Sequence, residues 1–135
     1  MSDLIIFDTS ILVDQLRTGR HRGRIETLSG LIRNCSVVMA ELWRGAATPA
    51  DREALLALGR NHPMLTPTEK NWLDSGEILA KVRADRGFAA DKLRGLHFDV
   101  LIALTARSHG ARLITSNRVD FEMINSYRKL ELEIW

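Results

Sequence analysis

Four acidic side chains stand at the ends of predicted strands or near the starts of the helices that follow, where catalytic residues of α/β proteins are often found. Asp8 directly follows the apolar residues 4–7, and Glu41, Asp99 and Asp120 stand at the end of a later predicted strand or near the start of the helix after it. Carboxylates that gather at one point repel one another, and a divalent cation relieves that repulsion. Hard cations such as Mg²⁺ and Mn²⁺ prefer carboxylate oxygens and retained waters. The four acids therefore predict metal-assisted hydrolysis of a phosphodiester bond.

The first predicted strand and helix must position Asp8. Residues 4–7 form an unbroken apolar run, which is typical of a strand buried on both faces. Ile11 and Leu12 begin a helical spacing after it, and Thr9 or Ser10 is the predicted helix cap. Ligands of open α/β sheets bind outside the carboxyl ends of the strands, so an acid that follows this strand is well placed.

The middle of the chain predicts further alternation of helices and strands. We expect a second helix with an apolar face at Ile25, Leu28, Leu31 and Ile32, and a second strand over residues 36–38. Glu41 then falls in the first turn of a helix over residues 39–45. A helix from Pro49, a brief strand over residues 64–66 and a long helix over residues 68–86 follow, whose stripe of Trp72, Gly76, Leu79 and Val82 predicts a core or subunit contact.

The last third of the chain supplies the other two acids. Residues 91–96 are predicted to be a polar connector, and the apolar helix after them carries Asp99 in its first turn, on the face shared by Ile102, Ala103 and Ala106. A strand over residues 112–115, a polar loop that leads into a short helix, and an edge strand over residues 130–135 complete the pattern. The sequence thus predicts one domain over residues 1–135, a three-layer α/β/α fold with a mainly parallel central sheet.

Charge and composition narrow the class of protein. The net charge of +2 and pI of about 9.0 are too mild to indicate nucleic-acid binding alone. If a metal neutralises the four acids, four is added to the net charge and the remainder carries +6, which suits a binder of phosphate backbones. Residues 17–24 contain four arginines and no acid. They predict either a basic loop that contacts phosphates or an acidic partner, or an ordinary solvated loop.

Other features exclude alternative chemistries and settings. No Gly-rich phosphate loop, Ser/His/Asp arrangement or zinc-ligand spacing is present, and Ser10 stands where an aspartate-nucleophile phosphatase would carry its second acid. A single cysteine, Cys35, cannot form an internal disulfide, no apolar run is long enough to span a membrane, and the N-terminus lacks a secretory pattern. We therefore expect a cytoplasmic protein without membrane contact.

Five motifs, taken in order, match a known family. They are residues 7–14, residues 36–42 with Gly45, residues 99–103 with Ala106, residues 113–117 with Gly110, Asp120 and Phe121, and the closing residues 132–135. Together they resemble a PIN domain, and most closely the VapC toxins of bacterial toxin–antitoxin modules. The resemblance spans essentially the whole chain.

The resemblance implies a PIN-like fold and an Mg²⁺- or Mn²⁺-dependent endoribonuclease. It also implies inhibition by a small VapB-like antitoxin, homodimerisation and a toxin–antitoxin hetero-oligomer. The substrate would be RNA, most readily a single-stranded loop. A second hypothesis keeps the fold but not the activity, as a catalytically silent PIN-like module that acts only in an antitoxin and DNA-binding complex.

The resemblance also assigns roles to individual residues. Asp8 and Asp99 match the acids most directly tied to the metal, and Glu41 matches the helix acid that completes the cluster. Some members carry their fourth acid where Asn117 stands here and others nearer Asp120, so we take Asp120 as the fourth acid and Asn117 as support. Thr9 or Ser10 would add a hydroxyl. The arginines nearest to these acids in sequence are candidate RNA or antitoxin contacts: Arg44, Arg94 and Arg118.

Overall fold

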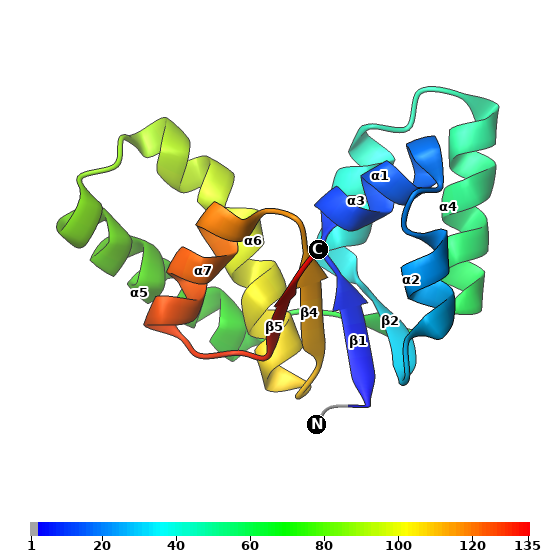
Figure 1. Ribbon diagram of the computed structural model, residues 1–135. Helices are drawn as coiled ribbons and strands as arrows, with labels where there is room; N and C mark the ends of the chain where they lie inside the picture. The colour runs from blue at the N-terminus through cyan, green and yellow to red at the C-terminus, as the bar shows by residue number, and fades with distance from the viewer. Residues whose placement is uncertain (1–2) are drawn as a thin grey trace.

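A parallel sheet forms the middle layer of this protein, whose structure is a computed structural model that describes residues 3–135. The five strands have the order β3-β2-β1-β4-β5, and each neighbouring pair is parallel. Their bounds are β1 Leu4–Phe7, β2 Leu31–Cys35, β3 Met64–Leu65, β4 Arg112–Thr115 and β5 Leu132–Ile134. Helices lie on both sides of the sheet (Figure 1), and the predicted three-layer α/β/α fold is confirmed.

The helices divide into two groups around the sheet. Figure 1 shows α1, α2 and α4 gathered on one side and α5, α6 and α7 on the other. The bounds are α1 Thr9–Thr18, α2 Arg22–Thr27, α3 Ser36–Arg44, α4 Pro49–Asn61, α5 Glu69–Arg86, α6 Ala90–Ser108 and α7 Arg118–Tyr127. Capping boxes begin α4 at Thr48 and α5 at Thr68, where each threonine hydroxyl accepts a hydrogen bond from a backbone N–H of the first turn.

The central strand β1 lies between β2 and β4. Ile5 and Ile6 are fully buried, as the unbroken apolar run predicts for a strand covered on both faces. The chain first adds β2 and β3 on one side of β1 and then crosses over to add β4 and β5 on the other. The carboxyl ends of β1 and β4 therefore form the topological switch point of the sheet, where α/β proteins bind their ligands.

The second strand and the helices around it differ from the prediction. The predicted helix through Leu31 and Ile32 ends at Thr27, and both of those residues belong to β2. The predicted strand over residues 36–38 is instead the first turn of α3. Val38 and Leu42 share one buried face of that helix, so burial on a helical face outweighs the strand preference of β-branched residues.

Three other predicted segments also change. The predicted connector over residues 91–96 is helical, because Leu93, Leu96 and Val100 give α6 an apolar face from its first turns onward. Most of the predicted basic loop over residues 17–24 belongs to α1 and α2. The buried residues of α5 are Asn71, Ser75, Ile78 and Val82. Of the predicted stripe, Val82 is therefore buried, whereas Trp72 is 51% exposed.

The structure also bears on the expected absence of membrane contact. Among residues 3–135, no helix combines the length and the apolar character that crossing a membrane requires.

Candidate active site

Asp8 lies at the carboxyl end of β1, as the sequence predicts. Its backbone N–H continues the sheet by donating to the carbonyl of Ile114 in β4 at 2.9 Å. The predicted cap of α1, Thr9 or Ser10, is wrong because Asp8 itself is the N-cap, with its carboxylate accepting from the Ser10 N–H. The side chain is only 3% exposed, so its charge is shielded from water. Asp8 is therefore a buried carboxylate held rigidly at the switch point.

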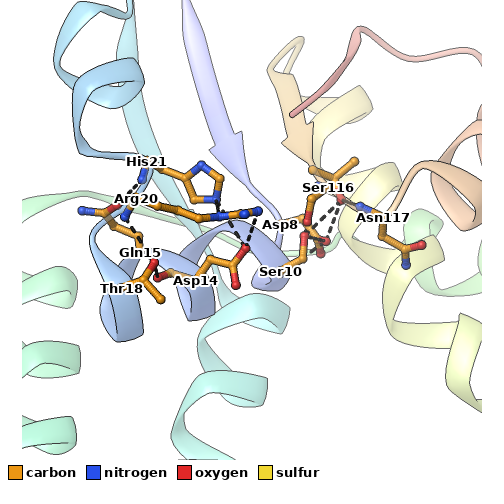
Figure 2. Close-up of polar contacts among 10 residues, drawn as sticks. Asp8, Ser10, Asp14, Gln15, Thr18, Arg20, His21, Ser116 and Asn117 are labelled. Carbon is orange, nitrogen blue, oxygen red and sulfur yellow. Dashed lines mark hydrogen bonds and ion pairs between the residues drawn. The ribbon is translucent and has the colours of Figure 1, made fainter.

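Hydroxyl groups orient the Asp8 carboxylate. The Ser10 hydroxyl and the Thr115 hydroxyl each donate to Oδ2 of Asp8 at 2.8 Å. Thr115 ends β4 and is fully buried, and its oxygen also accepts from the Asn117 N–H at 3.0 Å. Figure 2 shows Ser10, Ser116 and Asn117 around Asp8. Among residues 3–135, every hydrogen bond that the carboxylate accepts reaches Oδ2, which leaves Oδ1 for a ligand.

Glu41 approaches the same place from α3. It was predicted in the first turn, but the helix begins at Ser36, so Glu41 lies in the second turn. The Thr9 hydroxyl donates to its Oε1 at 2.8 Å. Burial raises the pKa of Glu41, and the negative charge of Asp8 raises it further, while the Thr9 hydrogen bond and the charge of Arg44 oppose this. Asp8 and Glu41 are thus near enough to repel each other.

Asp99 is the most perturbed acid of the site. It lies in the middle of α6 and not in the first turn as predicted, although Ile102, Ala103 and Ala106 are buried as expected for its face. Burial is the main cause that raises its pKa to about 8. The charges of the three other acids add to this, while Lys92 opposes it. The three other predicted acids therefore all lie close enough to Asp99 to act on it at this end of the sheet.

Asp120 closes the far side of the site from the first turn of α7. Lys92 forms an ion pair with its Oδ1 at 3.1 Å, and the Asn117 side-chain amide donates to its Oδ2 at 3.2 Å. Asn117 is the N-cap of α7, where its side-chain oxygen accepts from the Asp120 N–H. The two candidates for the fourth position therefore form one unit, in which the amide orients the acid.

Comparison with known proteins places this geometry in a family. A family model described as the PIN domain matches residues 5–125. The chain belongs to the PIN domain family. PIN domains are generally nucleases, and these nucleases generally use divalent metals. No curated protein matches this chain.

Solved structures share the fold of this PIN domain. A chain in the crystal structure of VapBC2 from Rickettsia felis bound to a DNA fragment from their promoter is 23% identical, with a TM-score of 0.72 over 98% of each chain. A chain of DNA-bound VapBC from Salmonella typhimurium is 22% identical, with a TM-score of 0.68 over 100% of this chain and 99% of that one. A chain in a toxin–antitoxin complex from Klebsiella pneumoniae is also 22% identical, with a TM-score of 0.61 over 87% and 89%.

The donor set of the PIN domain suits a hard divalent cation. Its candidate ligands are carboxylate oxygens, and the pKa of Asp99 is raised first by burial and then by the negative charges around it. Yet no three His, Cys, Asp or Glu side chains of residues 3–135 form a group that could hold a metal ion as they stand. Glu41 is tied to Thr9, and Asp120 is tied to Lys92. Because Mg²⁺ keeps several waters, it needs only one or two direct carboxylates, and the residues present fit it in that way.

The predicted arginine contacts divide into two kinds. Arg44 is near enough to the acids for its charge to lower the pKa of Glu41. Arg94 and Arg118 are engaged on their own helices, in ion pairs with Asp91 and Glu122. The geometry therefore brings only Arg44 to the acids.

Two residues that the sequence did not single out contribute to the site. Thr115 holds Asp8, and Lys92 pairs with Asp120. A hydroxyl residue at the end of the strand that pairs with β1 is a usable signal for Thr115, since the neighbouring strand end always faces the same crevice. Lys92 was hidden because its segment was predicted to be a connector outside any helix.

Proposed function

We propose that this PIN domain is a metal-dependent endoribonuclease toxin that hydrolyses RNA phosphodiester bonds and is neutralised by a cognate antitoxin. The observation that carries the proposal is that Asp8, Glu41 and Asp120, which come from different elements, all lie close enough to the largely desolvated Asp99 for their charges to raise its pKa further. Such crowding is unfavourable in the folded protein without a compensating cation. Perturbed acids of this kind cluster at functional sites.

Individual roles follow from the contacts of each side chain. Asp8 and Asp99 would hold Mg²⁺ or Mn²⁺, which when bound lowers the pKa of water and polarises a phosphoryl oxygen. Thr115, Ser10 and Thr9 orient the carboxylates of Asp8 and Glu41 without neutralising them. Arg44 lies close enough to Glu41 to bind a phosphate that enters the site.

Asp120 completes the negative side of the site in this proposal, and Asn117 supports it through the amide hydrogen bond. Arg94 and Arg118 would contact RNA at the margin only after leaving their ion pairs, so they contribute less than Arg44.

The proposed partners are a VapB-like antitoxin and a second copy of the chain, in a cytoplasmic toxin–antitoxin hetero-oligomer. Support for the antitoxin comes from the similar structures, which are of VapBC and toxin–antitoxin complexes. Support for a homodimer comes from apolar side chains on the α5, α6 and α7 side of the sheet. Trp72, Leu73 and Val119 are 51%, 69% and 78% exposed.

The decisive test is cleavage of RNA by purified protein with Mg²⁺, with Mn²⁺ and with EDTA. We expect fragments with either metal and none with EDTA. Asp8→Asn and Asp99→Asn should each lower the rate by about a hundredfold or more, as loss of a group that stabilises the transition state does. Asp74→Asn is the matched control, because Asp74 lies on α5 and pairs with Lys70 outside the acid cluster. Normal cleavage by Asp99→Asn would contradict the site assignment.

A silent binding module is the second candidate, and two observations favour it. The acids do not form a ready metal-binding group among residues 3–135, and Asn117 brings no charge. The first two similar structures are bound to DNA. If no metal supports cleavage, while the protein with its antitoxin binds promoter DNA, this second function replaces the first.

A further inference from the structure

A basic pocket lies beside the acid cluster and plays no part in it. Its lining is Arg20, His21, Arg24 and Trp135, and its volume is about 280 Å³. Arg20 and His21 lie between α1 and α2, and Arg24 belongs to α2. Trp135 directly follows β5. We refer to these four residues as the basic pocket.

Trp135 connects the basic pocket to the acid cluster. Its ring packs against Phe7, the residue before Asp8, with 5.7 Å between ring centroids, and against His21 at 5.4 Å. Its backbone N–H donates to the carbonyl of Thr115 at 2.8 Å, and the Thr115 hydroxyl holds Asp8. The pocket is thus anchored to the two strands whose ends carry the acids.

The charge of the basic pocket is only partly compensated. Arg20 forms an ion pair with Asp14 at 2.9 Å. Arg24 is exposed and stands over the Trp135 ring at 5.3 Å, and none of the ion pairs among residues 3–135 involves it. Arg22 on the same helix differs, because Glu26 pairs with it at 2.8 Å. Arg24 is therefore a positive charge that is held in place by an aromatic face and remains free for an anion.

We propose that the basic pocket binds a phosphate of the RNA strand that flanks the bond cleaved at the acid cluster, with Arg24 as the main contact and Arg20 as the second. A guanidinium matches two phosphate oxygens at once. The acids alone repel a polyanion, so the strand needs a cation close to them. This inference rests on the proposed ribonuclease function and names how that site holds its substrate.

The geometry favours an RNA strand over an acidic peptide. Phosphates recur at every nucleotide, so a strand with one phosphate at Asp8 carries its next phosphates across the adjoining surface. The basic pocket adjoins the acid cluster, since Thr115 contacts both Trp135 and Asp8, and Phe7, which packs against Trp135, directly precedes Asp8. A peptide carboxylate has no such fixed relation to the cleavage site.

The test measures binding of a short fluorescein-labelled single-stranded RNA by anisotropy in EDTA, where nothing is cleaved. Arg24→Ala should weaken binding about tenfold and make log K less dependent on log salt by about 0.7, the contribution of one phosphate contact on a single strand. Arg22→Ala removes the same charge from the same helix and should change binding less than twofold. Arg24→Lys should recover part of the affinity, which shows that lost charge and not lost packing is responsible.

Cleavage in Mg²⁺ or Mn²⁺ is measured separately with the same RNA. We expect Arg24→Ala to raise KM about tenfold with little change in kcat. Equal effects of Arg24→Ala and Arg22→Ala on binding would overturn the proposal, and so would a loss confined to binding of an acidic antitoxin. If the wild-type protein binds RNA through Arg24 but cleaves none with any metal, the phosphate site stands and the ribonuclease function fails.

Discussion

Two polar networks at the ends of α1 hold a carboxylate in opposite ways (Figure 2). Asp14 pairs with the Arg20 guanidinium at 2.9 Å, and Nε2 of His21, which accepts a hydrogen bond from Nε of Arg20, lies 3.5 Å away. Asp8 is held by the hydroxyls of Ser10 and Thr115, which carry no charge. The first network neutralises its acid, and the second only orients it.

This difference explains why charge accumulates at one end of α1 and not at the other. Neutral hydroxyls hold one oxygen each of Asp8 and Glu41 but leave the charges of these acids to act on Asp99, whose pKa is raised to about 8 mainly by burial and further by those charges. Asp14 is 37% exposed and ion-paired, which costs little and stores no such repulsion. A site that must attract a cation is favoured when its carboxylates are held in position but keep their negative charge.

The difference between the two networks predicts that the largest loss of stability results from substitution of Thr115, which holds Asp8. Thr115→Val should lower the free energy of unfolding by about 2–3 kcal/mol, because it leaves the part-buried N–H of Asn117 without a partner and removes one of the hydrogen bonds that the buried Asp8 carboxylate accepts. RNA cleavage should fall with it. Thr18→Val is the control from the other network, where the exposed Thr18 hydroxyl donates to the Asp14 carbonyl. Urea denaturation should show less than about 0.5 kcal/mol there, and equal losses would contradict the distinction.

The next largest effect concerns pH. The pKa of Asp99 is raised on folding, so the folded state binds one proton more than the unfolded chain between about pH 4 and pH 8. Its contribution to stability is complete below that window and is lost as pH rises through it. In EDTA, Asp99→Asn should therefore match the wild type near pH 4 and be more stable by at least about 2 kcal/mol at pH 8, since each unit of raised pKa corresponds to about 1.4 kcal/mol before screening by solvent.

Asp14→Asn provides the contrast for this measurement. It removes one partly exposed ion pair, so urea denaturation should show a loss below about 1 kcal/mol. A difference between Asp99→Asn and the wild type that stays constant from pH 4 to pH 8 would mean that Asp99 is not under the strain described.

The smallest effect is expected at Lys92, which among residues 3–135 is the one cation in an ion pair with an acid of the cluster. Lys92→Met should raise the pKa of Asp99 further, because the charge that opposes the shift is lost. The free energy of unfolding should change by only about 0.5 kcal/mol, since the Lys92 side chain is 47% exposed. NMR titration of Asp99 would test the direction, and a lowered pKa would contradict it.

The sequence predicted best the part of the site that is local to a strand end. Asp8 follows β1 without a gap, and residues 112–115 form β4, so both patterns could be recognised from short apolar runs. Glu41 and Asp99 were recognised as site acids but placed one turn or more too near their helix starts. The starts of α3 and α6 depend on burial against the sheet, which short-range preference does not encode.

The hydroxyl contacts could not be predicted at all. Thr115 reaches Asp8 across 107 positions of sequence, and Thr9 reaches Glu41 across 32. Only the pairing of β4 beside β1 and the packing of α3 beside α1 bring these groups together. The fold class could be predicted because it follows from the order of helices and strands along the chain. The side-chain partners could not, because they depend on how the strands are aligned and how the helices pack.

The crossover that brings β4 beside β1 also sets the order in which the site can be assembled. A chain that is still being synthesised carries Asp8 and Glu41 early, but the strand that presents Thr115 and the helix that presents Asp120 come only after α6. Contacts at such long separation form late, after the loop between them has closed. A nascent chain therefore lacks Thr115 and Asp120 until β4 and α7 have been made, and its acid cluster stays incomplete until then.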